Sequence, residues 1–254
     1  MEALARFPRQ HASQSLRRVI HASAAQLKFQ PQNLKGKSKA SQDWLTRHLN
    51  DPYVKQSRYD NYRARSAYKL VEIDDKYHIL KPGYNVVECG AAPGAWTQVI
   101  VERINADGRD ATTTRGTVIG LDILPIDPVP GATFLANTDI LKPETTEKIL
   151  KCLGGKSANA VLSDMAPNAS GVKSLDHEAV VALSYAALIL SFRVLSIGGS
   201  FLCKIWNGKE AVKLSDDIKK FFQFVSYVKP PASRKESAEI YILGRGFKGA
   251  ELKK

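Results

Sequence analysis

The sequence predicts an α/β protein with a mainly parallel sheet and helices on both faces. Short apolar runs alternate with longer segments of helical periodicity, and charged residues follow several of the runs. At 254 residues the chain can bury one substantial core. The predicted strands are Asn85–Cys89, Val118–Leu121, Ala132–Leu135, Ala160–Ser163, Ser200–Ile205, Phe224–Val228 and Ile240–Leu243.

Helical patterns separate most of these strands. Ser66–Tyr77 is predicted as an amphipathic helix, with Lys69 next to its apolar face. Gly198-Gly199 is expected to end the long helix before the fifth strand, and Asn105–Gly116 to form a long surface loop. The other predicted helices are Trp96–Ile104, Glu144–Leu153, Glu178–Leu195 and Lys209–Phe222.

The positive charge is concentrated at the N-terminus. Residues 1–40 hold eight Lys or Arg against the single acid Glu2, so they supply +7 of the chain's net +12. An Arg-rich, nearly acid-free leader is typical of an organellar transit peptide, and a disordered RNA-binding arm is the alternative. We expect one domain over residues 41–248 and a short basic tail over 249–254.

Composition argues against other classes of protein. No apolar run approaches the roughly 20 residues of a membrane span, so none is expected. The three cysteines have no CxxC spacing and the five histidines no HxxxH pairing, so no metal site is indicated. Cys89 and Cys203 lie in apolar strand patterns and are expected to be buried free thiols.

A turn of small residues, CGAAPGAW (89–96), joins the first predicted strand to a helix. Gly90 and Gly94 allow the backbone to pass close to a ligand, and Pro93 stiffens the turn. We therefore expect a cofactor here. The alternative is a strand-to-helix turn that needs glycine for packing alone.

Charged residues end five of the strands: Glu88, Asp122, Asp139, Asp164 and Lys204. Ligands of open parallel sheets bind at this edge. Asp122 is placed to accept hydrogen bonds from ribose hydroxyls, and Asp139 could reach an adenine amino group. The loop has neither GxGxxG nor GxxxxGK[ST], so S-adenosylmethionine fits better than NAD or ATP.

Successive segments of the chain resemble the motifs of FtsJ-type 2′-O-ribose RNA methyltransferases, across residues 40–247. Mitochondrial members of that family also resemble WLTRHLNDPYVK (44–55). The segments are RSAYKL (65–70), ECGAAPGAW (88–96), LDILPIDP (121–128), LSDMAPNASG (162–171), GGSFLCKIW (198–206) and SRKESAEIYILGRGF (233–247).

The resemblance implies a Rossmann-like methyltransferase fold, with a mostly parallel seven-stranded sheet whose last strand is antiparallel. It implies a catalytic tetrad of Lys69, Asp164, Lys204 and Glu239. The expected cofactor contacts, from the loop and from the family motifs, are Gly90, Pro93, Gly94, Trp96, Asp122, Asp139 and Asp164. Lys204 would engage the 2′-hydroxyl, as a base if neutral or as an orienting ammonium if charged, and the sequence leaves both open.

The implied reaction is methylation of a uridine in mitochondrial large-subunit ribosomal RNA, in the matrix, in support of ribosome biogenesis. The expected partner is that RNA or a pre-ribosomal particle, and a monomer is favoured. Arg58, Arg63 and Arg65 are interleaved with tyrosines and are candidate RNA contacts. Lys173, Arg234 and Lys235 could extend that patch around the pocket mouth. A hydrated basic face is the plain alternative.

Other functions fit less well. Amino-methylating enzymes usually have [DN]PP[YF] where this chain has Asp164-Met165-Ala166-Pro167, and cytosine-C5 enzymes need a nucleophilic cysteine, generally in a Pro-Cys pair that is missing here. The rival from another class is a non-catalytic ribosome-assembly factor that keeps the fold to bind RNA.

Overall fold

The computed structural model describes residues 36, 38–167 and 170–249. The chain divides into two units, Met1–Asp51 and Pro52–Lys254. In the first unit the described chain forms helix α2 (Lys39–Asn50), whose N-cap Ser38 accepts a hydrogen bond from the Ser41 amide. Almost all of the predicted leader lies outside the described residues.

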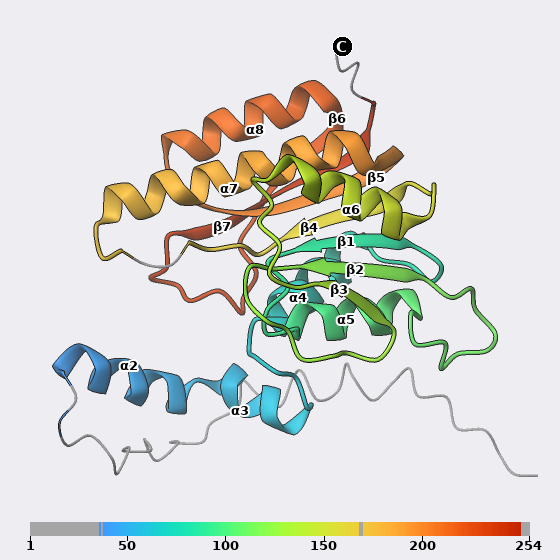
Figure 1. Ribbon diagram of the computed structural model, residues 1–254. Helices are drawn as coiled ribbons and strands as arrows, with labels where there is room; N and C mark the ends of the chain where they lie inside the picture. The colour runs from blue at the N-terminus through green and yellow to red at the C-terminus, as the bar shows by residue number, and fades with distance from the viewer. Residues whose placement is uncertain (1–35, 37, 168–169, 250–254) are drawn as a thin grey trace, which may run out of the picture. The chain divides into compact units, whose positions relative to one another are not determined.

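The second unit is built on a seven-stranded sheet in the order β3-β2-β1-β4-β5-β7-β6 (Figure 1). Among the described strands β7 alone runs antiparallel, between β5 and β6. The predicted mostly parallel sheet with an antiparallel last strand is therefore confirmed. The strands are β1 (Asn85–Cys89), β2 (Thr117–Leu121), β3 (Ala132–Leu135), β4 (Ala158–Ser163), β5 (Leu195–Trp206), β6 (Phe222–Val228) and β7 (Glu239–Phe247).

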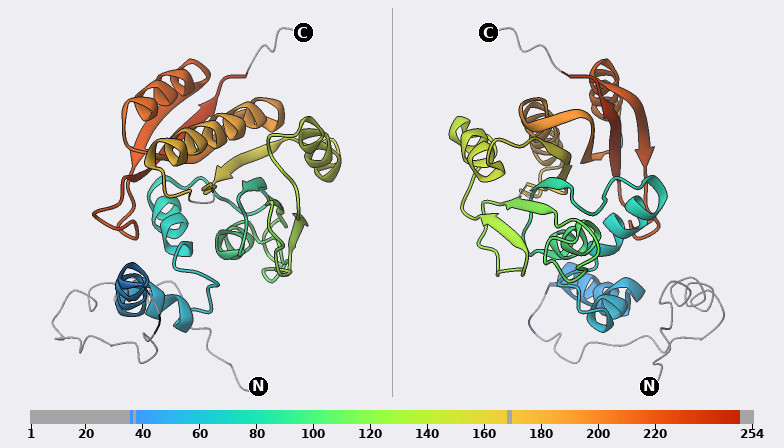
Figure 2. Two further views of the ribbon diagram at one scale, coloured as in Figure 1. Left: turned by 60° about the vertical axis from the view of Figure 1, so that its left-hand side comes forward. Right: turned by 90° about the vertical axis from the view of Figure 1, so that its right-hand side faces the viewer.

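Helices cover both faces of the sheet because successive strand residues point to opposite sides. Val87 and Phe201 pack against α6 (Pro143–Leu153), α7 (Lys173–Val194) and α8 (Lys209–Phe221). Their neighbours Val86 and Leu202 pack on the other face, against α4 (Ala67–Tyr77) and α5 (Ala95–Ile104) (Figure 2). Helix α3 (Pro52–Tyr59) precedes α4 and, like α2, was not predicted.

The predicted role of Gly198-Gly199 was wrong. Helix α7 ends at Val194, and both glycines lie inside β5, which begins at Leu195. A Cβ atom at Gly199 would come within 2.9 Å of the Ser196 carbonyl oxygen and 3.1 Å of the Asn159 carbonyl oxygen. The β4–β5 register shifts here, between Ala158 and Ala160, so the glycines accommodate an irregular strand instead of ending a helix.

Helix α7 is also more apolar than the sequence analysis allowed for. Among the described residues it alone is long and apolar enough to cross a membrane, by length and composition. In the fold it packs on β4 and β5, with Val180, Ala187 and Leu188 buried in the core. That packing accounts for the buried part of its apolar surface, whereas Ile189 on the same helix is exposed. Cys89 and Cys203 are buried free thiols, as predicted.

Candidate active site

The loop between β1 and α5 depends on two glycines in left-handed backbone conformation. Gly90 has φ +81° and Gly94 has φ +103°. A Cβ atom at Gly90 would lie 2.7 Å from Met165 Cγ, and one at Gly94 would lie 2.5 Å from Arg63 Nη1. The left-handed backbone and these close approaches favour glycine at both positions, which is compatible with the packing interpretation and with the cofactor interpretation of the loop.

Arg63 braces this loop from outside. Its guanidinium donates hydrogen bonds to the carbonyl oxygens of Pro93 (2.9 Å), Asp127 (2.7 Å) and Pro128 (2.7 Å). The Arg63 amide also donates to Gln98 Oε1 at 2.8 Å. The sequence predicts an RNA contact for Arg63, whereas in the structure its guanidinium joins the loop between β1 and α5 to the segment at Asp127 and Pro128.

A pocket opens beside the loop at the carboxyl edge of the sheet. Four of the predicted cofactor residues line it: Gly90, Asp122, Asp139 and Asp164. The Asp122 carboxylate accepts hydrogen bonds from the amides of Ala92 and Leu124, both at 2.9 Å, and Asp139 Oδ1 accepts one from the Leu141 amide at 2.9 Å. Backbone amides therefore hold both carboxylates at fixed positions along the pocket.

The other three predicted cofactor residues lie outside the pocket lining. Pro93 is exposed and Gly94 is buried against Arg63. Trp96 is 2% exposed, and its indole N–H donates to the Ser66 carbonyl oxygen at 2.9 Å. The Trp96 ring thus helps to join α5 to the start of α4.

The chemistry of the lining suits a nucleoside better than a phosphate. The lining contains apolar side chains such as Ile123, Leu124 and Met165 as well as the carboxylates, and none of the lining residues is Lys or Arg. Carboxylates accept hydrogen bonds from hydroxyl and amino groups but repel phosphate. The residues therefore fit S-adenosylmethionine, which has an adenosine and no phosphate.

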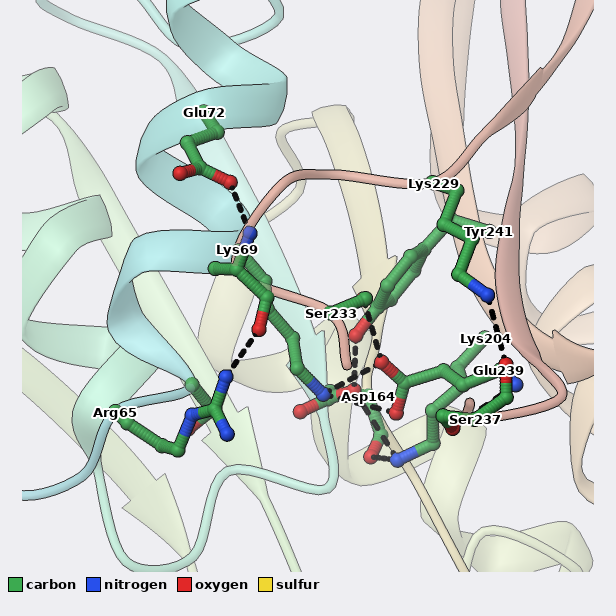
Figure 3. Close-up of polar contacts among 12 residues, drawn as sticks. Arg65, Lys69, Glu72, Asp164, Lys204, Lys229, Ser233, Ser237, Glu239 and Tyr241 are labelled. Atoms are coloured by element: carbon green, nitrogen blue, oxygen red, sulfur yellow. Dashed lines mark hydrogen bonds and ion pairs between the residues drawn. The ribbon is translucent and has the colours of Figure 1, made fainter. Parts of the chain in front are cut away.

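The structure brings together the four residues of the tetrad implied by the resemblance, from α4, β5, β7 and the end of β4 (Figure 3). Lys69 Nζ lies 2.6 Å from Glu239 Oε1 and 2.8 Å from Glu239 Oε2. Lys204 Nζ lies 3.1 Å from Asp164 Oδ1 and 2.5 Å from the Asp164 carbonyl oxygen. The side chains are 9–16% exposed, so the two ion pairs are largely shielded from solvent.

Asp164 belongs to both the pocket and the tetrad. Burial alone would raise the pKa of its carboxyl group, but the ammonium groups of Lys204 and Lys69 and the hydroxyl of Tyr241 outweigh burial and lower it. The carboxylate consequently stays ionised at neutral pH.

Sequence reasoning missed Tyr241. Its hydroxyl donates to Asp164 Oδ1 at 2.7 Å, and the centre of its fully buried ring lies 6.0 Å from Lys69 Nζ. Burial and the neighbouring carboxylates raise the pKa of Tyr241 well above 10, so the hydroxyl remains a donor. Strand alternation could have found it, because Tyr241 lies two residues after Glu239 on one face of β7 and opposite Lys204 on β5.

Glu88 differs from the other strand-end charges because it is only 1% exposed. Thr97 donates a hydrogen bond to Glu88 Oε2 at 2.6 Å. Burial, and then the charges of Asp164 and Asp122, raise the pKa of Glu88 to about 8. Glu88 is therefore a mostly protonated group beneath the loop at neutral pH.

The predicted RNA contacts have different environments. Arg58, at the end of α3, is exposed, as are Lys173 and Lys235, whereas Arg234 is half-buried. The Arg65 guanidinium donates to the Ala232 carbonyl oxygen and lies 5.5 Å from the centre of the Tyr53 ring. Arg65, like Arg63, is engaged within the protein.

Comparisons with known proteins identify the family to which the chain is similar. A family model described as FtsJ-like methyltransferase matches residues 62–247. The chain is 46% identical over 236 residues to rRNA methyltransferase 2, mitochondrial, of Drosophila melanogaster, covering 92% of this chain and 94% of that protein. It is 44% identical over 224 residues to ribosomal RNA large subunit methyltransferase E of Cereibacter sphaeroides, covering 88% and 91%.

A solved structure supports the same fold. The crystal structure of a ribosomal RNA methyltransferase from Plasmodium falciparum superposes with a TM-score of 0.65 at 31% identity, covering 74% of this chain and 100% of that one.

Proposed function

Because the chain belongs to the FtsJ-like methyltransferase family, we propose that it methylates the ribose 2′-hydroxyl of a uridine in mitochondrial large-subunit ribosomal RNA. S-adenosylmethionine, when bound, supplies a methyl group made electrophilic by a positively charged sulfur. Gly90, Asp122, Asp139 and Asp164 would hold it in the pocket that they line.

One observation carries the proposal: Asp164 lines the cofactor pocket and is paired with Lys204. A hydroxyl that contacts Lys204 Nζ would therefore lie beside the pocket. An ammonium has three N–H groups. Two are directed at Asp164 oxygens, which leaves one to orient the 2′-oxygen. The same nitrogen, if neutral, would accept the hydroxyl proton.

The ion pair of Lys69 and Glu239 does not contact the 2′-hydroxyl in this proposal, but it helps to hold the site around Lys204 in place. Lys69 and Glu239 neutralise each other at 2.6 Å, next to Asp164. Rigid placement of these groups favours in-line geometry between the hydroxyl oxygen and the methyl group, which lowers the barrier by alignment. Burial on strand ends and a helix provides that rigidity.

Lys204→Ala tests the assignment. We expect it to abolish methyl transfer to ribosomal RNA, measured with a radiolabelled methyl donor, while S-adenosylmethionine binding by calorimetry stays nearly intact. Lys209→Ala, which removes an exposed lysine at the start of α8, is the control and should be fully active. Retained turnover in Lys204→Ala would contradict the proposal. Mapping 2′-O-methyl sites with and without the protein would test the choice of uridine.

A non-catalytic role in ribosome assembly is the second candidate, since the rRNA methyltransferase relatives imply an RNA partner. The assembled tetrad favours an enzyme. Complementation of deficient cells with Lys204→Ala separates the roles. Normal assembly without the methyl group would show that assembly needs the protein and not its catalysis.

A mitochondrial matrix location is part of the proposal. The name of the Drosophila melanogaster relative and the net charge of +7 in residues 1–40 support it.

A further inference from the structure

The segment between β6 and β7 leads to Glu239 of the tetrad, and it is held at the backbone of one residue, Ala232, by Glu72 on α4 and by Arg65 just before α4. Ala232 is fully buried. Its N–H donates to Glu72 Oε2 at 2.7 Å, and its carbonyl oxygen accepts a hydrogen bond from Arg65 Nη2 (Figure 3). A carboxylate and a guanidinium thus hold the two ends of the same residue's backbone.

The two hydrogen bonds to the Ala232 backbone are strong because each has a charged partner. Hydrogen bonds with an ionised partner are shorter and stronger than neutral ones, and here both are charge-assisted. Tyr53 on α3 adds a further restraint, because its hydroxyl donates to Glu72 Oε1 at 2.9 Å while its ring lies under the Arg65 guanidinium.

Ser233, which follows Ala232, connects these backbone contacts to the tetrad. Ser233 is 5% exposed, and its hydroxyl donates to Glu239 Oε1 at 2.9 Å. The same oxygen lies 2.6 Å from Lys69 Nζ. Lys69 itself lies between Arg65 and Glu72 in the sequence, so the stretch of chain that holds the loop also supplies a member of the tetrad.

We propose that Arg65, Glu72 and Ser233 are positioning residues that fix Glu239, and through it Lys69, for methyl transfer. This rests on the proposed function of the tetrad. Arg65 then serves the reaction from inside the protein instead of contacting RNA phosphate. None of the three residues is among those that line the pocket.

Single-turnover methylation with saturating RNA and cofactor tests the proposal. Ser233→Ala removes one hydrogen bond to a charged group, so we expect the rate to fall about tenfold. Cofactor affinity should stay close to that of the unmodified protein, and the unfolding midpoint should fall by no more than a few degrees. Ser191→Ala is the matched control, because it removes another fully buried hydroxyl, bonded to the Leu188 carbonyl oxygen on α7. It should leave the rate unchanged.

Glu72 can be tested by comparing a conservative variant, Glu72→Gln, with Glu72→Ala. Glu72→Gln keeps an acceptor for the Ala232 amide, and its NH₂ group can donate to the Tyr53 hydroxyl, so it should retain most activity. Glu72→Ala should lower the rate and speed hydrogen exchange of the Ala232 amide, measured by NMR without any substrate.

Three results would overturn the proposal: unchanged turnover in Ser233→Ala, unchanged Ala232 exchange in Glu72→Ala, or a Ser233→Ala effect of the same size when Glu239 is already Ala. The last would show that Ser233 does not act through Glu239. Failure of the proposed function is a different result, because the unmodified protein would then transfer no methyl group to RNA.

Discussion

Glu88 shows how a single buried carboxyl group can set the pH dependence of stability. Its pKa is raised to about 8 in the folded protein, from an ordinary value of 4.5. Between those values the folded state keeps a proton that the unfolded state releases. The Glu88 contribution to stability is therefore fully present below about pH 4.5 and is lost as pH rises toward 8.

Glu88→Gln tests whether Glu88 makes the protein less stable as the pH rises. In the unmodified protein Glu88 should lower the free energy of unfolding by up to roughly 1.4 kcal/mol per pH unit between about pH 5 and 8. The variant should lack that slope, and urea denaturation at several pH values measures the difference. Glu178→Gln, at an exposed position on α7, is the control. Equal slopes in the unmodified protein and Glu88→Gln would refute the assignment.

Individual site residues differ in how far the sequence could predict them. Asp122, Asp139 and Asp164 follow apolar strands, so their meeting in one pocket follows from the parallel sheet alone. Lys69 and Glu239 are 170 residues apart, and neither has a local pattern that distinguishes it from a solvated charge. Their assignment came from the family resemblance, because an ion pair between distant segments depends on the tertiary fold.

At the scale of elements, hydrogen bonds from Arg63 join the loop between β1 and α5 to the segment at Asp127 and Pro128. Arg63 holds the Pro93 carbonyl on one side and the carbonyls of Asp127 and Pro128 on the other. Basic residues beside tyrosines gave no sign of this role. The sequence pattern is the same whether a guanidinium faces solvent or backbone oxygens.

Replacing Arg63 and Arg58 separately distinguishes a loop brace from an RNA contact. Arg63→Ala loses three hydrogen bonds beside the pocket, so we expect cofactor affinity to fall by about tenfold. Arg58→Ala removes an exposed charge on α3 and should weaken RNA binding without changing cofactor affinity. Calorimetry with the cofactor and filter binding with RNA measure the two effects. Unchanged cofactor affinity in Arg63→Ala would contradict the brace.

The elements themselves were predictable where burial is regular. The central strands and the helices α4, α5, α6 and α8 appear close to their expected bounds. The start of β5 was missed because Gly198, with φ +83°, interrupts its pattern, and the reason lies in the neighbouring strand β4. Helices α2 and α3 were missed because their segments are polar and have few apolar residues to mark a face.

At the scale of the whole molecule, the uneven charge distribution separates two roles for residues 1–40. As a transit peptide, this segment should send a fused fluorescent reporter to mitochondria, seen by microscopy. Its removal should then leave RNA affinity and the salt dependence of that affinity unchanged. A shallower salt dependence after removal would instead indicate an RNA-binding arm, because fewer phosphate contacts would be made.

The reversed strand β7 has a consequence for the order in which the protein is made. In the described sheet β6 pairs with β7 and no other strand, although the ribosome completes β6 first. Glu239, at the first position of β7, can reach Lys69 only when that strand enters the sheet between β5 and β6. A nascent chain that ends before β7 would have the strands and loops that line the cofactor pocket but lack the acid that holds Lys69. The proposed catalytic centre is thus completed only after β7, the last strand of the described sheet in chain order, has been synthesised.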